Sequence, residues 1–302
     1  MNEKAIEINK ESIEHWRDQK FGMFIHWGLF ALHGQGCWGM WLNQTDKDEY
    51  ARLADSFTAK KFDADAWASL AKEAGMKYMV LTAKHHDGFS LWDSKACLDD
   101  FTSVNSAAKR DFVKEYTDSC RKAGLMTGLY YSPLDWRFPG FFMPKIHKKS
   151  ADALVEQAHK QTEELVSNYG KIDLLWFDGS LKDLTNVITI DEIRALQPQI
   201  VVNDRLWGWG IGDYCSQYEC HLPKEDPGMP WETCQIWHVG GGWSYVKNAD
   251  KYRALDITLN QYETCKKWGG NLLLNIAPAA DGSVPEAYYT AVKEFGEAIK
   301  NG

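Results

Sequence analysis

The segment from Ile172 to Gly179 is an apolar run that ends in an aspartate and then in a glycine. A strand that stops on an acid just before the chain turns is how a barrel enzyme presents a catalytic carboxylate at its open face. Side chains alternate along a strand, so Trp176 and Asp178 share one side. An indole beside a carboxylate resembles a sugar-binding subsite, and Asp178 is therefore the first candidate for chemistry.

Four other expected strands also end in hydrogen-bonding or charged groups, although their interiors are apolar. These endings are His26, the run His85-His86-Asp87, the run Tyr130-Tyr131-Ser132, and the run Asn203-Asp204-Arg205. The carboxyl ends of barrel strands meet at one face, where active sites are built. Five such endings therefore favour one shared site over five unrelated structural positions.

Paired carboxylates suggest glycoside hydrolysis, which needs one acid as nucleophile or base and a second as proton donor. Asp178 supplies the first. Glu219 is the preferred second acid because it belongs to the long irregular segment Leu206–Met229, which is expected on the catalytic face. Glu232 is the fallback, since it opens a strand and should lie toward the bottom of the barrel.

The adjacent histidines His85 and His86 raise the alternative of a metal site. Neighbouring residues on a strand point to opposite faces, so both can meet one ion only at a bulge. The sequence offers no third ligand at a suitable spacing. We therefore predict neither a metal ion nor another cofactor.

The composition argues against several kinds of partner. The formal net charge is -8 and basic runs are missing from the sequence, which disfavours nucleic acids and anionic membranes. Aromatic residues make up 13% of the chain, and many of its 14 tryptophans lie near glycines, histidines and turns, as expected for a lined pocket. A neutral or weakly polar small substrate fits better.

Neither a signal peptide nor a membrane span is expected, because the first residues lack the apolar run of a signal and no segment approaches 18 apolar residues. The seven cysteines show neither CxxC pairs nor zinc spacing, which is typical of free thiols in a reducing compartment. The sequence thus predicts a cytoplasmic protein.

Strand-like runs alternate with helical patterns, the signature of a parallel α/β sheet or barrel. Strands are expected at Phe21–Trp27, Lys77–Lys84, Met126–Tyr131, Ile172–Phe177, Ile200–Asn203, Cys234–Trp237 and Leu272–Ile276. Helices are expected at Lys47–Ser56, Ala64–Ala74, Arg110–Ala123, Ala151–Asn168 and Ala249–Trp268. Since seven strands fall one short of eight and no linker or repeat divides residues 1–302, we predict a single-domain, distorted (β/α)8-like barrel of the TIM type.

Six segments together resemble the glycoside hydrolase family 29 α-L-fucosidases. They are FGMFIHWG at 21–28, KYMVLTAKHHDGFSLWDS at 77–94, GLYYSPLDW at 128–136, WFDG at 176–179, NDR at 203–205 and GGNLLLNIAPAADGSVP at 269–285. The resemblance implies a retaining exo-glycosidase that removes terminal α-L-fucosyl residues from a small oligosaccharide or glycoconjugate. It implies a covalent intermediate on Asp178, with Glu219, or else Glu232, as the acid/base.

The resemblance also implies which residues surround the sugar: His26, Trp41, His85, His86, Tyr131, Trp176 and Arg205. The match departs from the family at Gly39-Met40-Trp41, where a methionine stands for the glutamate of a family Gly-Glu-Trp stretch. A thioether cannot accept the hydrogen bonds of a carboxylate. The alternatives are therefore the same chemistry on a related sugar, such as an α-L-galactoside, or a silent sugar-binding protein.

Two further departures concern Glu219 and the end of the chain. The segment Asp213–Glu219 carries one residue more than the family pattern before its acid. After Pro285 the sequence predicts one helix, Glu286–Lys300, and not the C-terminal β-sandwich usual in the family. The pocket is then expected to be more open, or to be completed by another subunit of a homo-oligomer.

Overall fold

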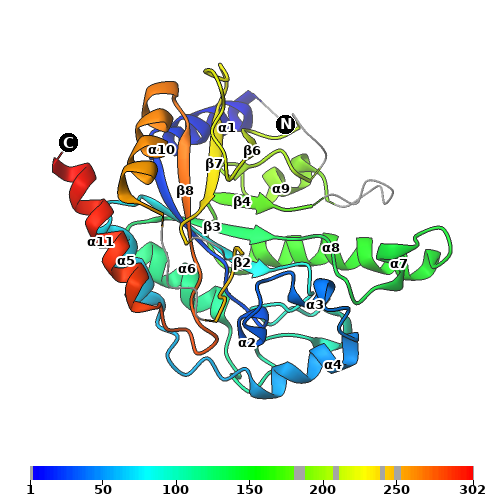
Figure 1. Cartoon of the computed structure of the whole chain (residues 1–302). Helices are drawn as coiled ribbons and strands as arrows, with labels where there is room; N and C mark the ends of the chain where they lie inside the picture. Colours follow the sequence, from blue (N-terminus) through cyan, green and yellow to red (C-terminus); the bar gives the residue numbers. More distant parts are fainter. Residues whose placement is uncertain (1–2, 180–187, 207–210, 239–241, 248–252, 302) are drawn as a thin grey trace.

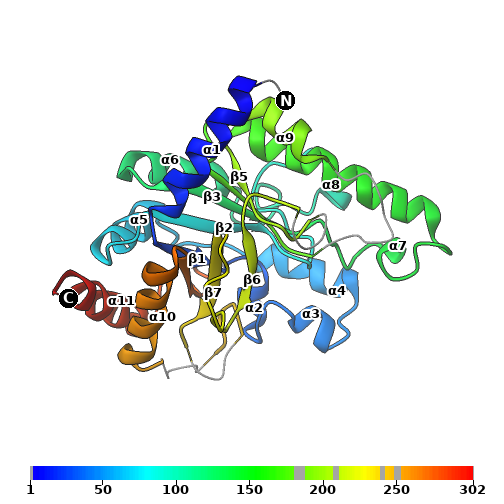
Figure 2. The same ribbon diagram turned by 90° about the horizontal axis from the view of Figure 1, so that it is seen from above.

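The computed structural model describes residues 3–179, 188–206, 211–238, 242–247 and 253–301. Its centre is one curled sheet of eight parallel strands in the order β5-β4-β3-β2-β1-β8-β7-β6 (Figures 1 and 2). The strands are β1 Phe21–Ile25, β2 Tyr78–Lys84, β3 Met126–Tyr131, β4 Leu174–Phe177, β5 Val201–Val202, β6 Cys215–Glu219, β7 Trp231–Ile236 and β8 Asn271–Ile276. The edges β5 and β6 are not paired as strands, but an isolated parallel bridge between Asn203 and Tyr214 connects them. The expected distorted (β/α)8-like barrel is confirmed.

Helices surround the sheet, and several short ones gather at the end toward which β2, β3 and β4 point (Figure 1). The longer helices are α1 Glu3–Arg17, α5 Ala64–Glu73, α6 Phe112–Ala123, α8 Lys148–Asn168, α9 Ile190–Leu196, α10 Leu255–Trp268 and α11 Glu286–Asn301. The short ones are α2 Phe30–His33, α3 Gly39–Leu42, α4 Lys47–Ala51 and α7 Pro139–Phe142. Residues 220–230, between β6 and β7, contain no helix, which is one source of the distortion.

Caps fix the helices that precede β2 and β3. The Asp63 carboxylate accepts a hydrogen bond from the Ala66 amide at the start of α5, and Asp111 does the same for Lys114 at the start of α6. Gly124 ends α6 at a φ of 71°, a left-handed conformation that glycine adopts without steric cost. These start and stop signals place the strands within a few residues of their sequence-based positions.

The helix α1 and the strand β6 were not expected from the sequence. Trp16 of α1 is fully buried, its ring lies 4.1 Å from that of Tyr214, and its carbonyl accepts a hydrogen bond from Asn271 at the start of β8. The helix therefore closes the amino-terminal end of the barrel. The strand β6 lies inside the segment expected to be irregular, and β7 begins at Trp231, three residues early, which places Glu232 within the strand.

The buried residues form an inner cluster within the barrel and an outer one between sheet and helices. Residues alternate between them: Tyr130 of β3 and Leu174 and Trp176 of β4 point inward, whereas Tyr131 and Phe177 point outward. Asp178 lies two residues after Trp176, so by the same alternation its carboxylate also points inward, at the open end of the barrel.

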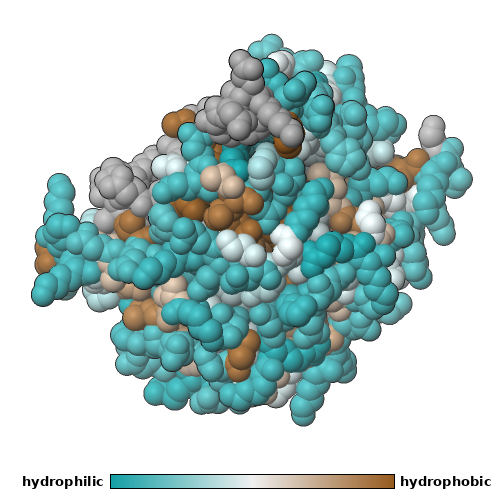
Figure 3. All heavy atoms as spheres, turned by 180° about the vertical axis from the view of Figure 1, so that it is seen from behind, coloured by the Kyte–Doolittle hydropathy of each residue, from teal (hydrophilic) through white to brown (hydrophobic). Residues whose placement is uncertain are grey.

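No helix in the described ranges is both long and apolar enough to cross a lipid bilayer. Figure 3 shows one face of the molecule, on which hydrophilic residues predominate and hydrophobic ones occupy small areas.

Candidate active site

A pocket of about 240 Å³ opens at the carboxyl ends of the strands. Ligand sites commonly measure roughly 300–1,000 Å³, so this volume suits a single small ring. The lining residues are Phe24, His26, Trp38, His85, His86, Tyr130, Leu134, Trp176, Asp178, Gly179, Arg205, Glu219, Cys234 and Trp243. The structure thus brings together seven of the residues singled out in the sequence: His26, His85, His86, Trp176, Asp178, Arg205 and Glu219.

Asp178 lies at the centre of this pocket and accepts two hydrogen bonds. The Tyr130 hydroxyl donates to its Oδ2 at 2.8 Å, and Nη1 of Arg205 donates to its Oδ1 at 2.9 Å. Burial alone would raise the pKa of this carboxyl, but the Arg205 charge, His86 and the Tyr130 hydrogen bond lower it below its usual value. The side chain is 23% exposed, so an ionised oxygen is accessible to a ligand.

Glu219, at the end of β6, shares the guanidinium of Arg205 with Asp178. Nη2 of Arg205 donates to Oε2 of Glu219 at 3.0 Å, and the Trp243 indole N–H donates to Oε1 at 3.1 Å. Arg205 also packs 4.5 Å above the ring of Trp176. One guanidinium therefore joins two carboxylates at the same small pocket, and a pair of carboxyl groups is what glycoside hydrolysis uses.

The histidines of the pocket are buried and neutral at neutral pH. Burial lowers the pKa of His26 and that of His86 to about 4. Nδ1 of His26 lies 2.6 Å from Asn275 Oδ1, and Nδ1 of His86 lies 2.6 Å from Ser132 Oγ, which orients each ring. Neutral imidazoles can donate to or accept from sugar hydroxyls.

His85 and His86 both face the pocket, unlike two successive residues within a strand. The strand β2 ends at Lys84, and its pairing with β3 shifts register between Thr82 and Lys84, so the histidines follow a bulge and lie beyond the strand. Nδ1 of His85 is buried and, among the described residues, has no hydrogen-bond partner.

A metal ion could also be held here, because ligand atoms of His85, His86 and Asp178 lie within 4.8 Å of one another. Arg205 already provides Asp178 with a positive charge at 2.9 Å, and a cation would compete with it. Hydrolysis by two carboxylates needs no ion, and the absence of a metal from the reaction remains a prediction.

Tyr131 does not line the pocket. Its hydroxyl donates to Gln161 Oε1 at 2.9 Å on the outer side of the sheet, whereas the preceding residue, Tyr130, points inward to Asp178. Tyr130 pairs in register with Trp176. The alternation that places Trp176 and Asp178 on one side of the sheet therefore places Tyr130, and not Tyr131, on that side.

Trp41 also lies outside the pocket, and Trp38 takes its place. The ring of Trp38 is 5.4 Å from that of His86. The pattern glycine, any residue, tryptophan occurs twice in succession, and the first copy, Gly36-Cys37-Trp38, reaches the pocket. Matched to this first copy of the pattern, the residue in the place of the implied family glutamate is Cys37 and not Met40. Burial raises the pKa of its thiol to about 12, so it stays uncharged.

Glu232 is buried in the interior and is not among the pocket-lining residues. Its Oε1 accepts from the Trp176 indole at 2.9 Å, and its Oε2 accepts from the Tyr78 hydroxyl at 2.6 Å. Trp176 thus stands between Glu232 and the pocket, a geometry that supports the ring and does not favour the fallback role as acid/base. Burial raises the pKa of this carboxyl to about 7.

Glu232→Gln is expected to change how stability depends on pH. Between the ordinary pKa of about 4.3 and the folded value of about 7, the folded chain keeps a proton that the unfolded chain releases. The free energy of unfolding of the parent therefore falls as pH rises through this window. Glutamine removes the titration while its amide can still meet Tyr78 and Trp176, so urea denaturation should show the variant gaining up to about 3 kcal/mol relative to the parent from about pH 5 to pH 8. Parallel pH curves would contradict this expectation.

Trp38 and Trp243 are pocket residues that the sequence analysis missed, and Tyr130 was named there only as part of a strand ending. Alternation could have found Tyr130, and the doubled glycine and tryptophan pattern could have found Trp38. Trp243 comes from the segment between β7 and β8, and its ring lies 5.2 Å from that of His26. Nothing periodic in that segment indicates the contact.

Comparison with known proteins points in one direction. A family model described as Alpha-L-fucosidase matches residues 1–301. The plasma alpha-L-fucosidase of Homo sapiens is 31% identical over 332 residues, which cover 97% of this chain and 69% of that protein. Alpha-L-fucosidase isoenzyme 1 from Paenibacillus thiaminolyticus superposes with a TM-score of 0.87 at 33% identity, covering 97% of this chain and 76% of that one. A trapped covalent intermediate of a GH29 alpha-L-fucosidase from Bacteroides thetaiotaomicron gives a TM-score of 0.85 at 26% identity, covering 96% and 74%.

Proposed function

The chain belongs to the alpha-L-fucosidase family, and from this premise we propose that it removes terminal α-L-fucosyl residues from a small oligosaccharide or glycoconjugate with retention of configuration. The observation that carries the proposal is the sharing of Arg205 between Asp178 and Glu219. It supports a nucleophile and an acid/base that act on one glycosidic bond.

In the first step, an oxygen of Asp178 attacks the anomeric carbon as the bond to the leaving oxygen breaks. The lowered pKa of Asp178 keeps this oxygen ionised, and Tyr130 and Arg205 fix its direction. Glu219 donates a proton to the leaving oxygen, which departs as an alcohol. The product is a glycosyl ester of Asp178, as in the covalent intermediate trapped in the relative from Bacteroides thetaiotaomicron.

In the second step, Glu219 accepts a proton from a water molecule, which attacks the same carbon and releases Asp178. Two displacements at one carbon restore the starting configuration. The neutral imidazoles of His26, His85 and His86 are proposed to bind sugar hydroxyls, while Phe24 and Trp176 supply an apolar floor. Trp176 is 2% exposed, so a sugar would contact an edge of its ring and not a free ring face.

A related sugar is the second candidate substrate, and Cys37 is the observation that favours it. An uncharged thiol at the glutamate position cannot accept charge-assisted hydrogen bonds from hydroxyls, so selectivity between sugars should be weaker here than with a carboxylate. The α-L-galactoside differs from the α-L-fucoside by one hydroxyl at C6 and is the informative competitor.

A panel of aryl glycosides should show hydrolysis of the α-L-fucoside, with slower hydrolysis of the α-L-galactoside. Proton NMR of the sugar first released should show the α-anomer, and a chelator should leave the rate unchanged. Binding of the aryl α-L-fucoside without turnover would support a silent sugar-binding protein instead. First release of the β-anomer would rule out retention, and loss of activity with the chelator would favour metal-dependent hydrolysis.

The cytoplasm is the proposed compartment. All seven cysteines are free and six of them are buried, as expected for a protein that folds where thiols stay reduced.

A further inference from the structure

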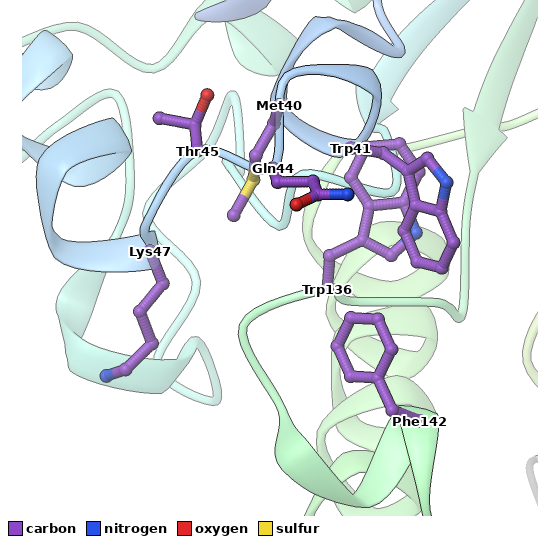
Figure 4. A pocket seen from close by; sticks show the side chains of 7 residues that line it. All are labelled: Met40, Trp41, Gln44, Thr45, Lys47, Trp136 and Phe142. Carbon is purple, nitrogen blue, oxygen red and sulfur yellow. The ribbon is translucent and has the colours of Figure 1, made fainter.

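A second cavity, which we call the aromatic cleft, lies beside the active-site pocket and encloses about 360 Å³ (Figure 4). Its aromatic side is formed by Trp41 of α3, Trp136 after β3 and Phe142 of α7, and its polar side by Gln44, Thr45 and Lys47. None of these residues takes part in the steps proposed above.

Trp136 forms the wall between the cleft and the pocket. Its ring lies 5.4 Å from that of His86 and 5.2 Å from that of Trp38, both of which line the pocket. It also lies 5.5 Å from the ring of Trp41 inside the cleft. His86 in turn lies 3.5 Å from the Asp178 carboxylate. His86 and Trp136 thus link the proposed reacting centre to the cleft through successive contacts, so the two cavities are close neighbours.

The exposed rings of the cleft are arranged to receive a flat apolar surface. Trp41 and Phe142 stack at 12° with their ring centroids 5.4 Å apart, yet Trp41 is 41% and Phe142 49% exposed. Large exposed aromatic side chains at the rim of a pocket mark binding sites. Stacked rings opposite amide and hydroxyl groups suit a pyranose, which has an apolar C–H face and a polar edge.

The charge of the cleft favours an uncharged ligand. Lys47 is the one ionised side chain in its lining, and its Nζ lies 3.2 Å from the Asp48 carboxylate, which balances it. Figure 4 shows the Lys47 side chain extending away from the aromatic side. An anionic sugar would therefore gain little from this lysine.

We propose that the aromatic cleft is a second sugar subsite, which binds a neutral pyranose of the glycan that carries the terminal residue. The inference rests on the proposed function and extends it: the pocket selects the sugar that is removed, and the cleft selects the glycan from which it is removed.

The test compares two kinds of substrate. α-L-Fucosyl fluoride has a leaving group too small to reach the cleft, whereas neutral α-L-fucosyl oligosaccharides of several linkages can extend into it. Trp41→Ala and Phe142→Ala should each lower kcat/KM for the best oligosaccharide about 10-fold to 100-fold, as expected for the loss of an aromatic anchor. Both variants should retain kcat/KM for the fluoride within about twofold.

Ile146→Ala is the matched control, because Ile146 is exposed and follows α7 but does not line the cleft. Gln44→Ala, on the polar side, is a second variant. It should also lower the ratio of kcat/KM for the oligosaccharide to kcat/KM for the fluoride. Circular dichroism and thermal unfolding should show that all variants fold like the parent.

Equal losses on both substrates would overturn the subsite, since they would mean that the rings merely support the pocket. Unchanged rates on every oligosaccharide, or a parent that cleaves the fluoride but none of them, would overturn it as well. If Trp41→Ala or Phe142→Ala changes the molar mass measured by light scattering but not the ratio of kcat/KM for the two substrates, the cleft would instead be a contact between two copies of the chain. A parent inactive on the fluoride would instead refute the proposed function.

Discussion

Replacing Asp178 with alanine is expected to lower kcat/KM for an aryl α-L-fucoside by about four to six orders of magnitude, the usual scale for losing a nucleophile. The alanine leaves Arg205 and the Tyr130 hydroxyl in place, but no oxygen remains to form the bond to the anomeric carbon. Steady-state kinetics measure the loss. Asp173→Asn is the matched control: Asp173 precedes the same strand at its opposite end, where it accepts from the Thr127 amide, and its change should leave the rate within about twofold.

Added azide makes the Asp178 prediction specific for a nucleophile. In Asp178→Ala an azide ion can enter the vacated space and attack the anomeric carbon of a substrate with a good leaving group. The carbon–nitrogen bond forms as the bond to the leaving oxygen breaks, and this single displacement inverts the configuration. The expected product is the β-L-fucosyl azide, identified by proton NMR. Full activity of the variant without azide would show that Asp178 is not the nucleophile.

Glu219→Ala is expected to lower kcat/KM for fucosides with poor leaving groups by about 10²-fold to 10⁴-fold, the range that a general acid contributes. Fluoride and dinitrophenolate leave without a proton, so for these substrates the first step should be almost unaffected. The control is Glu225→Ala: Glu225 is an exposed residue of the loop between β6 and β7, and its change should leave both substrates unaffected.

Azide also distinguishes Glu219 from Asp178. In Glu219→Ala the glycosyl ester on Asp178 still forms from activated substrates, and azide then attacks it in place of water. Two displacements retain the configuration, so the product should be the α-L-fucosyl azide. If the kinetics of Glu219→Ala are unchanged on poor leaving groups, the acid/base lies elsewhere, and Glu232→Gln becomes the variant to measure on the same substrates.

The sequence predicted the features of the fold that depend on local physics. Caps at Asp63, Asp111 and Gly124 set where helices start and stop, and continuous apolar runs marked β2, β3 and β8 within one residue of their observed bounds. Such signals act over a few residues, so a single chain reveals them. The strand β6 escaped notice because it is short and half-exposed at the sheet edge, and its polar residues read as a loop.

Within the candidate site, the sequence alone could not separate neighbours of the same type. Tyr130 and Tyr131 differ by one strand position, and that difference reverses the side of the sheet. Trp38 and Trp41 sit in successive copies of one short pattern; Trp38, just before α3, lines the pocket, whereas Trp41, within α3, does not. Trp243 reaches Glu219 across 24 residues of chain. Contacts of this kind arise from tertiary packing and leave no periodic trace.

The shared guanidinium of Arg205 has an electrostatic consequence for the proposed reaction. At the start, Asp178 carries one negative charge and Glu219 is protonated; in the intermediate, Asp178 is an uncharged ester and Glu219 carries the charge. Because Nη1 faces one acid and Nη2 the other, the single negative charge passes from one end of a stationary cation to the other. The total charge of the three groups stays constant through both half-reactions, so little rearrangement of the surrounding dipoles is needed between them.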